Sequence, residues 1–259
     1  MTDTTPILYL AWQDAFSRRW FPVGRLQKLA DQRYEFVYLR GYSEARAQAG
    51  MSPILGFPSP ETRYVSDSLF PHFQNRVMPR SREDYPVYLE RLGFREQPRD
   101  PLEILARSGG RKVTDSFSYY LFPEPAAILS PDGERRYAVC FFIHGMRHVQ
   151  PAAQERAGRA ELGEKLFLML DFQNPADPRA IAIRTHENHL LGYVPRFYCA
   201  DLHELYRRGQ SIELTVKHVN STPTPSWAGV MCRIEASWPE GFRALSAPEY
   251  EPLAAAVVS

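Results

Sequence analysis

The stretch "LDFQNPADPRAIAIRTHENHLLGYVPR", from Leu170 to Arg196, decides how the second half of the chain is interpreted. A polar Asn-Pro-Ala-Asp-Pro turn is followed by a short strand-like segment, then by loop residues and Gly-Tyr-Val-Pro. Asn and Asp favour turns because their side chains bond to their own backbone, and Pro fixes φ. The stretch contains no phosphate loop, nucleophile elbow or metal-ligand spacing. It predicts a turn in front of a buried strand rather than a catalytic motif.

Composition is that of a globular chain with a substantial core. The 259 residues are 44% hydrophobic and 24% charged, which fits one large or two small domains. The formal net charge is only +1. Such a balance argues against broad, sequence-blind coating of duplex DNA, but it leaves room for a small site that binds a few phosphates.

The cysteines and the N-terminus indicate a cytoplasmic protein. Cys140, Cys199 and Cys232 are far apart and form no C-x-x-C pair, which predicts buried thiols in a reducing compartment. The first residues lack the basic and apolar regions of a signal peptide. No apolar run approaches the roughly 20 residues that a membrane helix needs.

The order of patterns predicts an α+β fold in three parts. Residues 1–130 form a small antiparallel sheet with helices, residues 137–240 form an OB-like β-barrel with one short helix, and residues 241–259 form a flexible tail. Between the first two parts, the turn-rich segment 130–136 ("SPDGERR") is a linker or a surface hairpin.

In the first part, aromatic residues occupy every second position over 34–38, which predicts a strand. Two or three such strands make the sheet. A helix is expected from a cap at Ser81 to a stop at Gly93. A second helix is marked more clearly by "DPLEILARSGG", from Asp100 to Gly110. The Asp caps it, the Pro takes its first position, a Glu completes a capping box, and Gly-Gly ends it.

In the second part, closely spaced strands predict a small β-barrel or a curled sheet rather than βαβ units. The helix follows Gly-Tyr-Val-Pro, with Leu202, Leu205 and Tyr206 on its inner stripe and Gly209 as its stop. The expected strands lie within residues 136–149, 163–172, 179–185, 188–194, 211–219 and 227–238.

Three segments of this part occur in an order that resembles the HIRAN domain. They are "HGMRHV", "GEKLFLMLDFQNPADPRAIAI" and "LLGYVPR" followed by a helix, and the resemblance covers about residues 138–236. It implies an OB-type barrel. It also implies capture of the 3′ end of single-stranded DNA, as in the DNA-remodelling helicases that carry such a domain.

The resemblance also implies residue roles. Arg147 and His148 stand where an Arg and an aromatic follow the Gly after the first strand, so that a base would stack on the imidazole. Asn174 and Asp177 match the turn, with the Asp expected at the 3′-hydroxyl, and Ala176 replaces the aromatic of eukaryotic members. Tyr193 then supplies part of that stacking.

Single strands are held by aromatic platforms and a few cations. His148, Tyr193 and Trp227 offer π-faces. Arg147, Arg196 and Lys217 offer charge, with Arg196 expected on a backbone phosphate.

Structural alternatives stand beside these roles. Asn174 and Asp177 are common turn formers, Tyr193 equally fits a strand core, and Trp227 fits an anchor for the neighbouring Ser-Thr-Pro-Thr-Pro loop.

The first part resembles, more faintly, the N-terminal subdomain of HipA-type toxin kinases. Leu69–Val77 and Leu102–Gly110 occupy the places of that family's motifs, within a similarity from about Leu8 to Phe122. The chain has no room for the kinase core, so the resemblance implies a contact module and no kinase activity.

Enzyme and metal motifs are weak throughout. "SGGRK", from Ser108, lacks phosphate-loop spacing, and the pairs His144/His148 and His186/His189 have no joining cysteine. A metal nuclease would need Asp171, Asp177 and Glu187 to gather. We expect a non-enzymatic protein without catalytic, cofactor or metal residues.

Two hypotheses follow. In the first, the barrel binds single-stranded DNA at a 3′-hydroxyl end and the N-terminal region engages a protein partner. In the second, the chain is a protein–protein module, such as a toxin–antitoxin accessory subunit, that has lost DNA binding. Ala176 and the neutral charge favour the second, whereas Arg147, Tyr193 and Arg196 favour the first.

Overall fold

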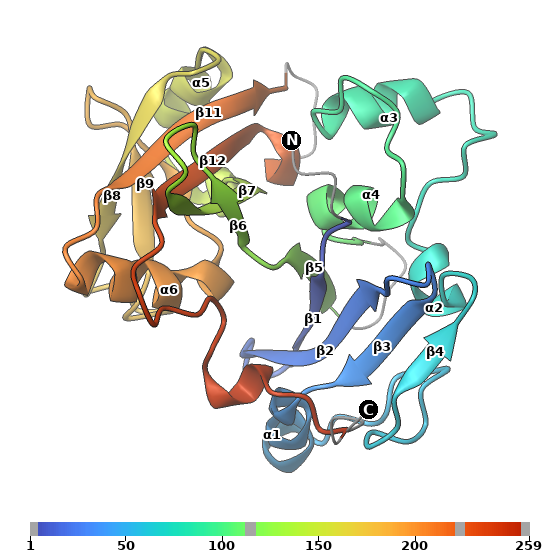
Figure 1. Cartoon of the computed structure of the whole chain (residues 1–259). Helices are drawn as coiled ribbons and strands as arrows, with labels where there is room; N and C mark the ends of the chain where they lie inside the picture. The colour runs from blue at the N-terminus through green and yellow to red at the C-terminus, as the bar shows by residue number, and fades with distance from the viewer. Residues whose placement is uncertain (1–4, 112–117, 221–225, 255–259) are drawn as a thin grey trace. The chain divides into compact units, whose positions relative to one another are not determined.

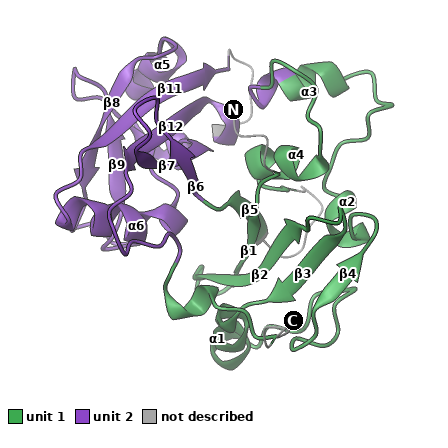
Figure 2. Ribbon diagram, in the orientation of Figure 1, with its two compact units in different colours: residues 1–89, 94–124, 246–259 green, residues 90–93, 125–245 purple. Residues whose placement is uncertain are grey.

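The computed structural model describes residues 5–111, 118–220 and 226–254 (Figure 1). These residues contain two antiparallel sheets and six α-helices, which confirms the α+β class. Contacts divide the chain into two units (Figure 2). Unit 1 comprises Met1–Leu89, Phe94–Glu124 and Ser246–Ser259, and unit 2 comprises Glu90–Gly93 and Pro125–Leu245.

Unit 1 is built on a sheet of five strands in the order β4-β3-β2-β1-β5. The strands are β1 (Leu8–Gln13), β2 (Trp20–Lys28), β3 (Tyr34–Tyr38), β4 (Tyr64–Ser66) and β5 (Ser118–Pro123). The sheet is larger than predicted because β5 returns from far along the chain to pair with β1. Phe36, Phe57 and Phe73 pack together in the core.

The helices of unit 1 are α1 (Arg40–Ala49), α2 (Pro71–Gln74), α3 (Tyr85–Arg91, whose end belongs to unit 2) and α4 (Pro101–Ser108). The prediction for α4 is confirmed in every feature: a capping box of Asp100 and Glu103, Pro at the first position, and a left-handed Gly109. For α3 the predicted start at Ser81 is wrong. The helix begins at Tyr85. Just before it, the Arg82 guanidinium donates two hydrogen bonds to the Asp84 carboxylate.

Unit 2 is built on seven antiparallel strands in the order β10-β9-β8-β11-β12-β7-β6. They are β6 (Ala126–Leu129), β7 (Arg135–Phe142), β8 (Lys165–Leu170), β9 (Ile181–Arg184), β10 (Leu190–Tyr193), β11 (Ile212–Val219) and β12 (Val230–Ser237). One bridge, between His144 and Tyr193, connects edge strand β10 with the segment after β7. The sheet therefore curls towards closure, but it is not a barrel closed by a strand ladder.

The described residues of unit 2 contain two complete α-helices, so the expectation of one short helix is wrong. α6 (Arg196–Arg207) is the predicted helix, although Tyr206 is 63% exposed instead of lying on the inner stripe. The additional helix is α5 (Pro151–Gly158). Its buried side consists of Ala153 and Ala157, so that its sequence shows little apolar periodicity. In Figure 1 the two helices lie at opposite ends of β8 and β9.

Two further expectations, for the segment 130–136 and for the tail, are compared with the structure as follows. Segment 130–136 is a hairpin rather than a linker, because Ser130 N donates to Glu134 O between β6 and β7. The described residues of the predicted tail are packed, since Phe242 and Leu245 are buried and Leu253 N donates to Tyr38 O.

Cys199 and Cys232 are buried as predicted, but Cys140 on β7 is exposed. Among the described residues, no helix is long and apolar enough to cross a membrane.

Candidate functional site

The turn quoted at the start joins β8 to β9 and is closed by its own backbone. Asp171 N donates to Ala180 O (2.9 Å), Ala180 N to Asp177 O (2.9 Å), and Asn174 N to Asp171 O (3.1 Å). These bonds hold the side chains of the turn in fixed positions beside β9 and α6.

Asn174 organises the inside of this turn. Its Oδ1 accepts hydrogen bonds from the backbone N of Ala176 (3.0 Å) and Asp177 (3.2 Å), and its Nδ2 donates to Asp171 Oδ2 (3.1 Å). The amide is therefore occupied by the protein itself. This geometry supports the alternative in which Asn174 is a turn former, and it gives the residue a positioning part in the site.

Asp177 lies at the end of the turn and is paired with the first residue of α6. Its Oδ1 accepts from Arg179 N (3.0 Å) and its Oδ2 from Arg196 Nη2 (2.9 Å). The two side chains are 16% and 37% exposed. A carboxylate offers about four acceptor positions and a guanidinium five donors. Both groups thus keep capacity for a ligand while they remain paired.

Tyr193, at the end of β10, faces the same turn. Its hydroxyl donates to Asp171 Oδ2 (3.3 Å), and burial together with the Asp171 carboxylate raises the pKa of the phenol. The hydroxyl therefore stays protonated at neutral pH. On its other side the ring lies against Gly145, where an added Cβ would come within 3.4 Å of Tyr193 Cδ2.

Gly145 begins the short 3-10 helix η1 (Met146–His148) with a left-handed φ of 75°. Arg147 and His148 are both exposed, and Arg147 Nε donates to His148 Nε2 (2.9 Å). Since His144 and Tyr193 exchange backbone hydrogen bonds (2.8 and 3.0 Å), this exposed pair follows directly on the backbone that supports the Tyr193 ring.

Trp227 lies in a second 3-10 helix, η2 (Ser226–Ala228), which contacts η1. Its ring stands edge-on to buried Phe142, with centroids 5.9 Å apart. Trp227 is half-buried, in agreement with an anchoring part. The loop 221–225 that it was expected to anchor lies outside the described residues.

The structure thus brings together most of the predicted residues, with Lys217 as the exception. Lys217 is exposed at an irregularity of β11, between Val216 and His218. Within the described part of the chain, no hydrogen bond or ion pair connects it to the others. The residues brought together are Asn174, Asp177, Tyr193 and Arg196, with Arg147, His148 and Trp227 around the neighbouring Gly145 turn.

Asp171 also belongs to this group of side chains, although the sequence suggested it only as a possible metal ligand. It accepts from both Tyr193 and Asn174 and so connects the turn with the ring. An Asp directly after a strand and three residues before Asn174 was the available signal. Glu187, the third acid of that hypothesis, faces Arg156 (3.4 Å). No cluster of three metal-binding side chains occurs in residues 5–111, 118–220 and 226–254.

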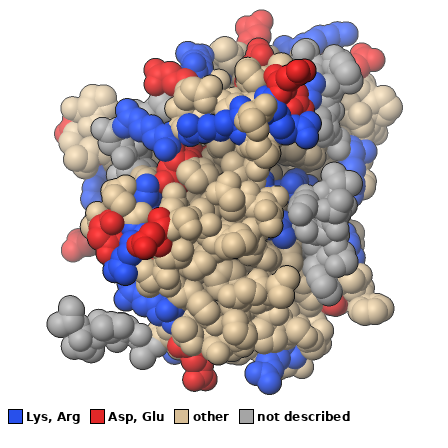
Figure 3. Space-filling view, turned by 90° about the vertical axis from the view of Figure 1, so that its right-hand side faces the viewer, with Lys and Arg blue, Asp and Glu red and all other residues tan. Residues whose placement is uncertain are grey.

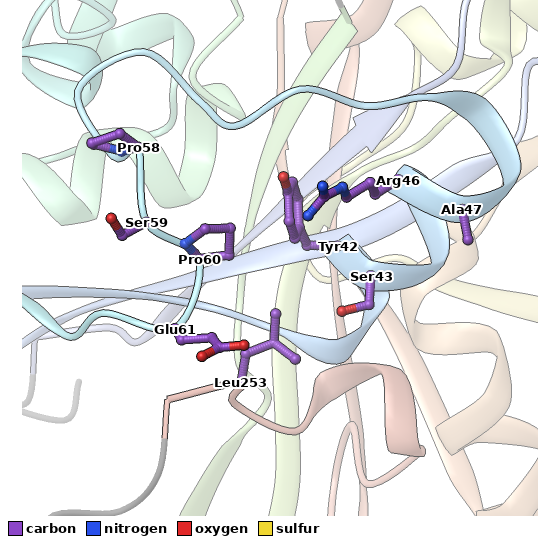
Figure 4. A pocket seen from close by; sticks show the side chains of 9 residues that line it. All are labelled: Tyr42, Ser43, Arg46, Ala47, Pro58, Ser59, Pro60, Glu61 and Leu253. Carbon is purple, nitrogen blue, oxygen red and sulfur yellow. The ribbon is translucent and has the colours of Figure 1, made fainter.

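Unit 1 contains a pocket (Figure 4). It is formed by α1, the segment 58–61 and Leu253, and it includes none of the predicted site residues. The hydroxyl of Tyr42, which lines it, is buried without a hydrogen-bond partner.

Charge on the surface is mixed. On the face drawn in Figure 3, Lys and Arg atoms lie beside Asp and Glu atoms around a broad uncharged area.

No curated protein matches this chain. A crystal structure of a protein from Lactobacillus plantarum is 19% identical over 39% of this chain and 96% of its own, with a TM-score of 0.32. A crystal structure of the HIRAN domain of human HLTF is 17% identical over 39% of this chain and 73% of its own, with a TM-score of 0.28.

The family comparison bears on unit 2, while the HipA-like resemblance of the first part stays a prediction. The region that matches begins in β7 and ends just after β12, so it contains the turn, Tyr193 and the 3-10 helices η1 and η2. The family seen in the sequence motifs is thereby confirmed for this part of the chain: residues 137–239 match the HIRAN domain, a family associated with DNA binding.

Proposed function

We propose that unit 2 binds single-stranded DNA at a 3′-hydroxyl end. The observation that carries the proposal is the connected group of Asp177, Arg196 and Tyr193 beside the exposed Arg147–His148 pair. This group combines an acceptor, cations and aromatic rings, which are the components that hold a single strand.

Each component has a defined task in this proposal. Asp177 accepts the hydrogen of the terminal 3′-hydroxyl with an oxygen position that Arg179 and Arg196 leave open. Arg196 keeps one donor on Asp177 and directs others to the adjacent phosphate. The Tyr193 ring, held by Asp171, packs along a base or sugar.

The protein acts in this proposal by binding and not by catalysis. The N-terminal region is proposed to engage a protein partner, a suggestion that rests on the HipA-like sequence resemblance.

One observation favours the second hypothesis, a protein–protein module. Ala176, at the tip of the turn, is exposed and offers no ring, and the carboxylate of Asp177 is already paired with Arg196. A chain that had lost DNA binding would show these same features. Binding measurements separate the two hypotheses.

The test is fluorescence anisotropy with a labelled single strand and a blunt duplex of the same sequence, at moderate salt. We expect the single strand to bind more tightly than the duplex. Asp177→Ala should weaken single-strand binding about tenfold, the effect of removing a hydrogen bond to a charged group.

Asp132→Ala is the matched control, because Asp132 also accepts a hydrogen bond in an exposed turn of unit 2 but lies in the β6–β7 hairpin. Its affinity should equal that of the wild type. Absence of single-strand binding by the wild type, or equal effects of both variants, would contradict the proposal and direct the search to a protein partner.

A further inference from the structure

A large aromatic side chain is exposed at the same turn. Phe172 follows Asp171 directly and is 68% exposed. Its ring lies beside the imidazole of His203 on α6, with centroids 6.1 Å apart and planes at 47°. An exposed aromatic face in an otherwise polar turn contributes little to the core, because it remains in water.

α6 connects this aromatic pair with the candidate site. Arg196 on its first turn holds Asp177, and His203 Nε2 is 3.1 Å from Arg179 O at the end of the same turn segment. The two α6 residues are seven positions apart, which is about 10 Å along a helix. The turn therefore lies along one side of α6, with the ion pair at one end and the aromatic pair at the other.

We propose that Phe172, supported by His203, is a stacking platform for a base of the single strand whose 3′ end is held at Asp177. The proposal rests on the proposed function and extends its site along α6. Every base presents a π-face, so such a platform accepts any base. It supplies the aromatic surface that Ala176 lacks.

The separation along α6 defines which base is held. Stacked nucleotides advance by about 3.4 Å each. A separation of about 10 Å thus corresponds to about three nucleotides. Counted from the terminal nucleotide, three steps reach the fourth, so the platform is assigned to a base within the last four nucleotides of the strand.

Unit 2 contains a matched control for this assignment. Phe167 on β8 is 51% exposed and also lies beside a histidine, His186, with centroids 6.3 Å apart. It pairs in register with Arg184 in the sheet, outside the Asp171–Ala180 turn. Phe167→Ala therefore removes an exposed ring of the same kind from the same unit.

The experiment measures anisotropy of the full chain, as wild type, Phe172→Ala, Phe172→Trp and Phe167→Ala. The probes are a 3′-hydroxyl single strand and a series of the same strand with one abasic site at each of its last four positions. Phe172→Ala should lose about tenfold in affinity for the intact strand. The loss should disappear on the strand that is abasic at the stacked position, and Phe172→Trp should bind like the wild type.

Failure of the inference and failure of the proposed function are distinguishable. If the wild type binds single strands but Phe172→Ala behaves like Phe167→Ala, only the platform is overturned. Equal losses by Phe172→Ala on the intact and on all abasic strands also overturn it, because stacking requires a base. If the wild type binds no single strand, the proposed function fails and the platform with it.

Discussion

At the scale of single residues, Tyr193 combines two tasks. Its hydroxyl is bonded to Asp171, and its ring lies against the Gly145 turn. The two hypotheses from the sequence, strand core and π-face, are therefore not exclusive. The ring is half-buried, so that one part of it packs and another part stays accessible.

Two substitutions separate these tasks. Tyr193→Phe keeps the ring and should change single-strand affinity less than threefold, while removing a hydrogen bond worth about 1 kcal/mol of stability. Tyr193→Ala removes the ring and should weaken binding about tenfold, as expected for a lost stacking surface. Anisotropy and urea unfolding measure both. Equal losses of affinity would show that DNA depends on the hydroxyl rather than on the ring.

Local patterns predicted some side-chain roles and could not predict others. The turn-forming bonds of Asn174 involve residues within three positions, so the sequence indicates them directly. The pairing of Asp177 with Arg196 depends on how α6 is placed against the turn. The bond from Tyr193 to Asp171 likewise needs the register of β8, β9 and β10. The spacing of residues along the sequence does not indicate such long-range contacts.

At the scale of elements, Gly192 is the point where edge strand β10 meets the segment after β7. Its φ is 145°, and an added Cβ would lie 2.3 Å from His144 O, the backbone atom that accepts from Tyr193. Only glycine allows this approach.

We therefore expect Gly192→Ala to break the His144–Tyr193 bridge, with a loss of stability of more than about 2 kcal/mol and a loss of single-strand affinity. Gly163→Ala is the control, since Gly163 also has a positive φ (84°) but an added Cβ meets nothing within 4 Å. Gly163→Ala should lower the free energy of unfolding only by the backbone strain of about 1–2 kcal/mol, and its affinity for single strands should be unchanged. Urea unfolding and anisotropy compare the pair, and equal behaviour would contradict the importance of the bridge.

Asp100 is the corresponding element-scale feature of unit 1. Its Oδ1 caps α4 by accepting from Leu102 N (2.9 Å), and its Oδ2 accepts from Lys28 Nζ (2.8 Å) and Tyr34 OH (2.9 Å). Asp100→Ala removes the cap and takes the acceptor from the buried Tyr34 hydroxyl and from the partly exposed Lys28 ammonium, so it should lower the free energy of unfolding by about 2 kcal/mol or more.

Urea unfolding measures this loss. Asp31→Ala, in an exposed pair with Arg33, should leave the urea midpoint unchanged, and single-strand affinity should be unchanged in both variants. An Asp100 variant that unfolds at the wild-type midpoint would refute this view of α4.

The contrast between α4 and α5 shows which elements the sequence predicts. α4 carries its start and stop signals in adjacent residues, and all of them act as expected. α5 buries two alanines, so no apolar stripe marks it. β5 was missed for another reason, because it joins the sheet of unit 1 only through pairing with distant β1.

At the scale of the whole molecule, the small net charge predicts a weak dependence of single-strand affinity on salt. The net charge is +1, and the sequence predicts at most three cations for DNA: Arg147 and Arg196, which lie at the proposed site, and Lys217, which the structure places outside it. Single-strand binding loses about 0.7 log units per phosphate contact for each tenfold rise in salt.

Three contacts therefore predict a slope of log affinity against log salt of about −2 or shallower. Anisotropy between low and moderate salt determines it, and Arg196→Gln should make the slope shallower by about 0.7. A wild-type slope steeper than about −4 would indicate broad coating by many basic residues and would contradict a small end-binding site.

The most direct test of the central claim compares the chemistry of the DNA end. The affinity of the full chain is measured for one single strand carrying either a 3′-hydroxyl or a 3′-phosphate, in the wild type and in Asp177→Ala. The hydroxyl end donates to the Asp177 carboxylate, whereas a terminal phosphate meets it as a like charge. The account predicts about tenfold preference of the wild type for the hydroxyl end, and loss of that preference in Asp177→Ala. Equal binding of both ends by the wild type, or a preference that survives in Asp177→Ala, would contradict it.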